Sequence, residues 1–141
     1  MSDQGKRIAV FGAGYVGLVT GACFAELGHT VTVRDVIPEK IAALRRGEVP
    51  IYEPGLDELL ARNRERMSFT LDVADAIDRA EFVYVAVGTP PTYSGDSDLS
   101  AVWTVVDELP ANKSATGWFP STVMMSEPES PLSLNGPPTT T

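Results

Sequence analysis

The sequence contains one cysteine, Cys23, and one histidine, His29. A single thiol excludes an internal disulfide and favours a reducing compartment, so we expect a cytoplasmic protein. Basic residues are also scarce, with 11 Lys and Arg against 19 Asp and Glu and a formal net charge of −8. Proteins that bind a phosphate backbone present clustered Lys and Arg, so this balance argues against a nucleic-acid partner.

The sequence also lacks a convincing targeting or membrane-spanning segment. The run from Ile8 to Ala25 is apolar and follows two basic residues, which superficially resembles a signal peptide. However, the run contains four glycines, and glycines at this density weaken a spanning helix. A strand pattern follows it rather than a cleavage site, so we predict neither secretion nor membrane association.

The chain of 141 residues, 43% hydrophobic and 21% charged, has the length and composition of one soluble domain with a core. Short β-branched runs predict strands at 7–11, 30–34, 68–71 and 81–87. Helices are predicted at 15–27, 38–46, 56–64, 73–79 and 99–109, with Asp72 and Asp98 as the caps of the last two. Strands that alternate with helices indicate an α/β protein with a doubly wound parallel sheet of the Rossmann type.

The segment Gly12-Ala13-Gly14-Tyr15-Val16-Gly17 matches the pattern G-x-G-x-x-G between the first strand and the first helix. In this context Gly12 permits a tight turn, Gly14 lets a pyrophosphate approach the backbone, and Gly17 lets the helix pack closely on the sheet. The free N–H groups at the helix start, from Tyr15 onward, would stabilise the phosphates. A glycine-rich turn without a ligand is the alternative.

Asp35 follows the second strand, 21 residues beyond Gly14, at the spacing expected for a carboxylate that binds the adenosine ribose hydroxyls. Such a carboxylate repels a 2′-phosphate, so the sequence favours NAD over NADP. Arg34 could accept a 2′-phosphate, but strand alternation predicts that it faces away from the ribose if Asp35 faces it. The alternative for Asp35 is a solvated acid at the end of a strand.

Two further polar residues are candidates for cofactor contacts. Lys40, one turn into the second helix, could reach the adenosine end of the cofactor, or it could be an exposed helix lysine. Thr89 follows the fourth strand, whose carboxyl end should lie next to that of the first. Its hydroxyl is therefore placed to contact the ribose or nicotinamide side, although a turn-forming role explains it equally well.

Four blocks of the sequence resemble the UDP-glucose/GDP-mannose dehydrogenase family. They are G-A-G-Y-V-G-L-V-T-G-A-C-F-A-E-L-G-H-T-V-T, E-V-P-I-Y-E-P-G-L, A-V-G-T-P and D-L-S, and the resemblance runs from about Lys6 to Leu109. The I-Y-E-P-G-L block, Ile51 to Leu56, has no explanation in the general Rossmann pattern and is the most specific signal. It argues against other dehydrogenase classes that share the glycine turn.

The resemblance implies a four-electron, NAD-dependent oxidation of the C6 alcohol of a sugar nucleotide, UDP-glucose, to a carboxylate. It places cofactor contacts at Val16, Asp35, Lys40 and Thr89. In the family a cysteine of a C-terminal domain holds the intermediates as a thiohemiacetal and a thioester. The chain does not contain that domain, and the family dimerises through elements beyond it, so no oligomer can be inferred.

The remaining thiol and imidazole are not expected to replace that missing chemistry. Cys23 lies in the first helix, where we predict a small buried hydrophobe. His29 is predicted to be a surface turn residue. The sequence thus indicates an NAD-binding portion that is inactive alone, with a stand-alone dinucleotide-binding module without catalysis as the alternative.

The composition changes after Pro110. Residues 1–110 are predicted to form an incomplete NAD-binding domain, and the sheet to be truncated. Residues 111–141 are rich in Pro, Ser and Thr without periodicity, which predicts a disordered tail or, alternatively, a reading-frame shift near Asn112. Ser121-Thr122-Val123 echoes a turn of the family, but we interpret the likeness as coincidence.

Overall fold

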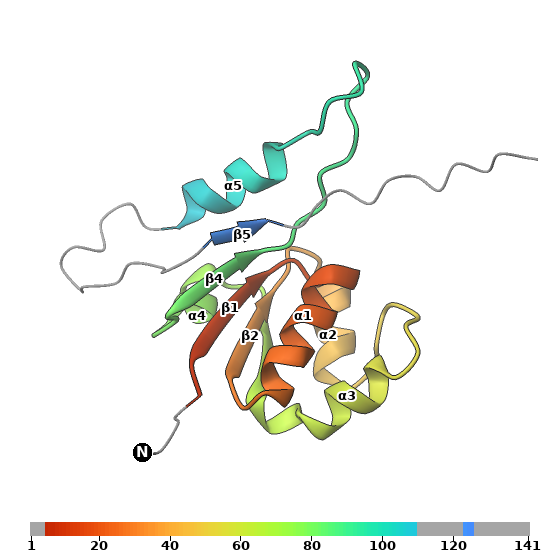
Figure 1. The fold of residues 1–141 in the computed structure, drawn as a ribbon, viewed down its shortest axis with the longest axis vertical. Coiled ribbons are helices and arrows are strands. Elements are labelled where there is room, and N and C mark those ends of the chain that lie inside the picture. Colours follow the sequence, from red (N-terminus) through yellow and green to blue (C-terminus); the bar gives the residue numbers. More distant parts are fainter. Residues whose placement is uncertain (1–4, 110–122, 126–141) are drawn as a thin grey trace, which may run out of the picture.

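A parallel five-stranded sheet forms the centre of the domain (Figure 1). The structure is a computed structural model that describes residues 5–109 and 123–125. Its strand order is β3-β2-β1-β4-β5, which confirms the predicted Rossmann-type fold. The chain winds outward from β1 to β3 and then returns to β4 on the other side of β1. The strands are β1 (Arg7–Phe11), β2 (Thr30–Arg34), β3 (Met67–Thr70), β4 (Phe82–Val85) and β5 (Val123–Met125).

Helices cover both faces of this sheet (Figure 1). Side chains alternate along β1, so Ile8 and Val10 enter one core while Ala9 and Phe11 enter the other. The first core packs against α1 (Tyr15–Glu26), α2 (Pro38–Arg45) and α3 (Leu56–Arg62), which a short 3₁₀ turn (Arg64–Arg66) follows. The second core packs against α4 (Val73–Ile77) and α5 (Ser100–Glu108).

Small residues form the face that α1 turns toward the sheet. Gly17, Gly21, Ala22 and Ala25 are all buried there, so the helix can approach the strands closely. The prediction of a buried Cys23 is wrong, because this thiol is exposed. At about 100° per residue, position 23 falls outside the face that residues 17, 21, 22 and 25 share.

Most predicted elements are present, with shifted ends. Asp72 caps α4 as predicted, since its Oδ1 accepts hydrogen bonds from the N–H groups of Ala74 (2.6 Å) and Asp75 (3.3 Å). That helix ends before Arg79, which adopts a left-handed φ of 55°. Asp98 accepts a hydrogen bond from the Ser100 N–H, but α5 begins one residue later than predicted. Among the described residues, no helix combines the length and apolar character needed to cross a bilayer.

β5 corrects the prediction that no strand forms beyond Pro110. Val123, Met124 and Met125 pair in parallel with Val83, Tyr84 and Val85 of β4. The edge of β4 offers backbone N–H and C=O groups to any extended segment, so this pairing does not require a long alternating pattern. The rest of the predicted tail lies outside the described residues.

Candidate dinucleotide site

A cleft of about 430 Å³ lies beyond the carboxyl ends of β1, β2 and β4, where α5 forms its far wall. This is the point at which the strand order reverses, the usual place for a ligand in an open parallel sheet. Of the predicted site residues, Gly12, Gly14, Asp35 and Lys40 line the cleft. The other lining residues are Phe11, Arg34, Val36, Ile37, Ala86, Val87, Gly88, Ala101, Thr104 and Val105.

Two glycines of the turn are required by close contacts. Gly12 has a φ of +112°, and a Cβ there would lie 2.3 Å from the carbonyl oxygen of Ala86 at the end of β4. A Cβ at Gly17 would lie 1.8 Å from the carbonyl oxygen of Gly12. Both distances are far below van der Waals contact, so only glycine at these two positions lets the turn pack this closely against β4 and the start of α1. Gly17 is buried and does not line the cleft.

Gly14 differs, because a Cβ there would meet nothing within 4 Å. It is the N-cap residue of α1, and no side chain caps this end of the helix. The first N–H groups of an α-helix have no partner within the helix, and they carry its positive partial charge. The side chains of Tyr15 (exposed) and Val16 (half-buried) do not line the cleft, so any contribution from them is through the backbone.

Asp35 is buried directly after β2, and neighbouring groups stabilise its negative charge. Its Oδ2 accepts a hydrogen bond from the Ala13 N–H (2.8 Å), and its Oδ1 accepts one from the Ile37 N–H (3.0 Å). Lys40 Nζ lies 3.5 Å from Oδ2. Burial raises the pKa of this carboxyl, but the two N–H donors and the Lys40 charge outweigh it and hold the pKa below its ordinary value. The carboxylate is therefore ionised at neutral pH.

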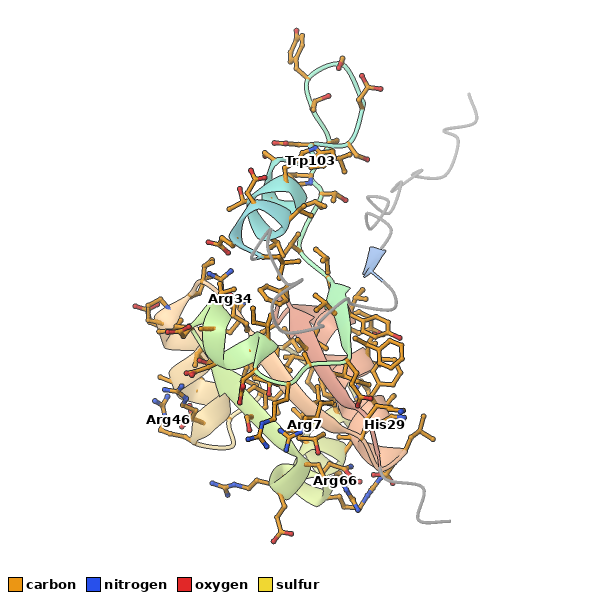
Figure 2. The ribbon with its side chains drawn as sticks, turned by 90° about the vertical axis from the view of Figure 1, so that its left-hand side faces the viewer. Arg7, His29, Arg34, Arg46, Arg66 and Trp103 are labelled. Atoms are coloured by element: carbon orange, nitrogen blue, oxygen red, sulfur yellow. The ribbon has the colours of Figure 1, made fainter. Side chains whose placement is uncertain are left out.

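Arg34 borders the same cleft as Asp35. That it faces away from the ribose, if Asp35 faces it, stays a prediction. Strand alternation does not apply here, because β2 ends at Arg34 and Asp35 lies in the turn that follows. Arg34 is buried, and its NH1 forms an ion pair with Glu108 of α5 (3.0 Å). Figure 2 shows Arg34 below α5, with His29 at the opposite end of the sheet.

Thr89 is buried, and within the described residues its Oγ1 has no hydrogen-bond partner. An unpaired buried hydroxyl is costly, so such a group points to a missing partner. Thr89 does not line the cleft itself, but the preceding residue, Gly88, does.

The other two features noted in the sequence lie away from the cleft. His29 is half-buried in the turn before β2, where its Nδ1 accepts a hydrogen bond from the Lys6 N–H (3.0 Å). The block from Ile51 to Leu56 forms the turn that leads into α3, with Leu56 buried and Tyr52 94% exposed. It borders a separate hollow with Gly47 and Val49.

The sequence reasoning missed the apolar walls of the cleft. Val36 and Ile37 form one wall, directly after Asp35. The opposite wall comes from α5, where Ala101, Thr104 and Val105 share one face. The i, i+3, i+4 spacing of these three residues could have indicated that face, but not what it opposes.

The residues present fit a dinucleotide. The opening at Gly14 leaves room at the start of α1, and Asp35 offers an ionised acceptor. The Thr89 hydroxyl, which has no partner among residues 5–109, is available to donate. Fold and site together define a dinucleotide-binding domain of the Rossmann class.

The profile of the UDP-glucose/GDP-mannose dehydrogenase family, NAD binding domain, matches residues 6–126. The chain belongs to this family, and its cofactor is NAD. The match extends through β5 and so includes Ser121-Thr122-Val123.

Relatives and solved structures agree with this assignment. UDP-glucose 6-dehydrogenase of Pseudomonas aeruginosa is 50% identical over 107 residues, covering 74% of this chain and 24% of that protein. UDP-glucose 6-dehydrogenase TuaD of Bacillus subtilis is 48% identical over 99 residues, covering 69% and 22%. The structure of a UDP-glucose dehydrogenase from Pyrobaculum islandicum superposes with a TM-score of 0.73 at 38% identity, covering 77% of this chain and 26% of that one. The chain thus spans about a quarter of the length of these relatives.

Proposed function

We propose that this chain is the NAD-binding portion of a nucleotide-sugar dehydrogenase that oxidises the C6 alcohol of UDP-glucose to a carboxylate, supplying a precursor for polysaccharide synthesis. The names of the relatives support this substrate. The observation that carries the proposal is the pairing of an open helix start at Gly14 with the ionised Asp35, both lining one cleft.

The proposed contacts follow the chemistry of the residues. The N–H groups of Tyr15, Val16 and Gly17 at the start of α1 would hold the pyrophosphate together with the helix dipole, which requires no basic side chain. Gly12, whose N–H already donates to the Arg34 carbonyl oxygen (2.8 Å), and Gly14 would shape the turn around it. This arrangement is compatible with a net charge of −8.

Asp35 would accept hydrogen bonds from the two adenosine ribose hydroxyls. Its oxygens already accept from Ala13, Ile37 and, at 3.5 Å, Lys40, and a carboxylate has about four acceptor sites. One site is therefore available, and the second ribose hydroxyl would replace the long contact with Lys40. Lys40 would keep this carboxylate charged. The apolar walls at Val36 and Ala101 would enclose the adenine ring.

Thr89 would donate its unpaired hydroxyl toward the ribose on the nicotinamide side. When bound, NAD supplies the hydride acceptor for the sugar carbon. The described residues that line the cleft include no cysteine or histidine to handle the oxidised sugar, and Cys23 lies outside it. We therefore propose that this chain binds NAD in the cytoplasm but does not turn over UDP-glucose alone.

The substitution Asp35→Asn tests the proposal. It retains the shape of the side chain but removes the charge and some acceptor capacity, so we expect NAD affinity to fall about tenfold to a hundredfold. Isothermal titration calorimetry with NAD measures the loss. Asp57→Asn makes the same change at an exposed residue outside the cleft, and it should leave the affinity unchanged.

Two results would contradict the proposal. Equal NAD affinity in the Asp35→Asn variant and the unchanged chain would remove Asp35 from the site. NADH formation from UDP-glucose by this chain would show that it is catalytically complete.

A further inference from the structure

The ion pair between Arg34 and Glu108 connects two walls of the cleft. Arg34 is the last residue of β2, and Glu108 is the last residue of α5. Their NH1 and Oε2 atoms are 3.0 Å apart, and the side chains are 10% and 36% exposed. A pair with one partner this buried is screened less by salt than a surface pair. It therefore keeps more of its electrostatic effect at physiological salt than a pair on the surface would.

Two further contacts fix the guanidinium group. Arg34 Nε donates a hydrogen bond to the carbonyl oxygen of Leu71 (3.2 Å). Its Cζ lies 5.8 Å from the centre of the Phe11 ring, a distance at which a cation is attracted to the ring. Figure 2 shows this side chain below α5. Arg34 is thus held in place on three sides while it lines the cleft.

The end of α5 is an unfavourable position for the negative charge of Glu108. A carboxylate in the last turn of a helix lies at the negative end of the helix dipole, and α5 has no basic residue there to compensate. The ion pair with Arg34 offsets this repulsion. It also neutralises Arg34, which would otherwise be a buried cation lining the same cleft as Asp35.

A free arginine next to the ribose-binding acid is the group that accepts a 2′-phosphate in NADP-binding proteins of this fold. We propose that Glu108 determines selectivity for NAD over NADP by neutralising Arg34 and holding it in place. Asp35 alone repels a 2′-phosphate, but an unpaired Arg34 would offset that repulsion. This inference rests on the proposed placement of the adenosine ribose at Asp35.

The test is the substitution Glu108→Gln in the 141-residue chain, with NAD and NADP each titrated by calorimetry. Removing one negative charge and releasing Arg34 should lower the ratio of the NADP to the NAD dissociation constant by roughly fivefold. Asp107→Asn is the matched control, since this exposed acid precedes Glu108 on α5 and its change alters the net charge equally. It should leave the ratio unchanged. Adding Arg34→Met to Glu108→Gln should restore the original ratio.

The outcomes separate the two proposals. If NAD binds and the ratio stays the same in the Glu108→Gln variant, or changes equally in Asp107→Asn, the role of Glu108 is overturned while the proposed function stands. If the unchanged chain binds neither nucleotide, the proposed function fails, and this inference fails with it. Circular dichroism spectra establish that each variant is folded, and Glu108→Gln removes only a half-exposed charge.

Discussion

Asp35 shows how backbone N–H groups can keep a buried acid charged. Its main support comes from the backbone N–H groups of Ala13 and Ile37, which the glycine turn and the start of the next turn place around it. Lys40 adds a longer contact. The same donors also contribute to the stability of the domain.

This support predicts a pH dependence of stability. The pKa of Asp35 is lower in the folded chain than in the unfolded one, so the ionised group stabilises the fold above the unfolded pKa of about 3.9. This contribution is lost as the pH falls through the folded pKa. Urea unfolding of the unchanged chain and the Asp35→Asn variant should differ by a constant free energy near neutral pH. The difference should shrink below about pH 4, and one that grew there would contradict the sign.

Some residues of the site could be predicted from the sequence, and others could not. Gly12, Gly14 and Asp35 stand at fixed spacings along the chain, and the structure brings them to one cleft. The partner of Arg34 could not be predicted, because it is Glu108, 74 residues later. Thr89 was singled out from its place after the fourth strand, but only the fold reveals that its hydroxyl lacks a partner among the described residues.

At the scale of the element, α1 explains why burial was harder to predict than helicity. The sequence of this helix is apolar nearly all round, so its pattern does not indicate which side faces the sheet. The exposure of Cys23 follows from packing of glycine and alanine against β1 and β2, which only the fold determines. β5 was missed for a related reason, because its pairing with β4 is a backbone interaction between segments distant in sequence.

Substitutions at Gly14, the N-cap of α1, and at Gly17, within the helix, should distinguish a role in binding from a role in packing. Gly17→Ala forces a Cβ against the carbonyl oxygen of Gly12, so we expect a loss of stability of about 1–3 kcal/mol. Gly14→Ala meets no protein atom, so it should cost less than about 1 kcal/mol, but its methyl group enters the opening proposed for the pyrophosphate.

Chemical denaturation and NAD calorimetry on both variants distinguish these roles. Gly14→Ala should be stable and bind NAD weakly. A variant of Gly14 that binds NAD normally would exclude close approach of the phosphates at this position.

At the scale of the whole molecule, the cleft lies between the strand ends of the sheet and α5. The ends of β1, β2 and β4 form one side, and α5 forms the other. Figure 1 shows α5 at the margin of the domain, apart from the helices that cover the opposite face. A ligand that touches both sides would link them.

Binding should therefore stabilise the entire domain. A ligand at a hundredfold excess over its dissociation constant adds about 2.7 kcal/mol to the unfolding free energy when it binds only the folded state. We expect the melting temperature of the chain to rise with the logarithm of NAD concentration. Thermal scans over a range of NAD concentrations, with NADP as a comparison, provide the measurement. A melting temperature independent of NAD would show that the folded chain does not bind it.

The exposed Cys23 has a practical consequence, because it is the sole thiol of the chain. A maleimide dye would attach at one defined place, on the helix whose opposite end faces the proposed phosphates. The same thiol can cross-link only to another molecule, so samples kept without a reductant would accumulate covalent dimers unrelated to any non-covalent assembly of the chain.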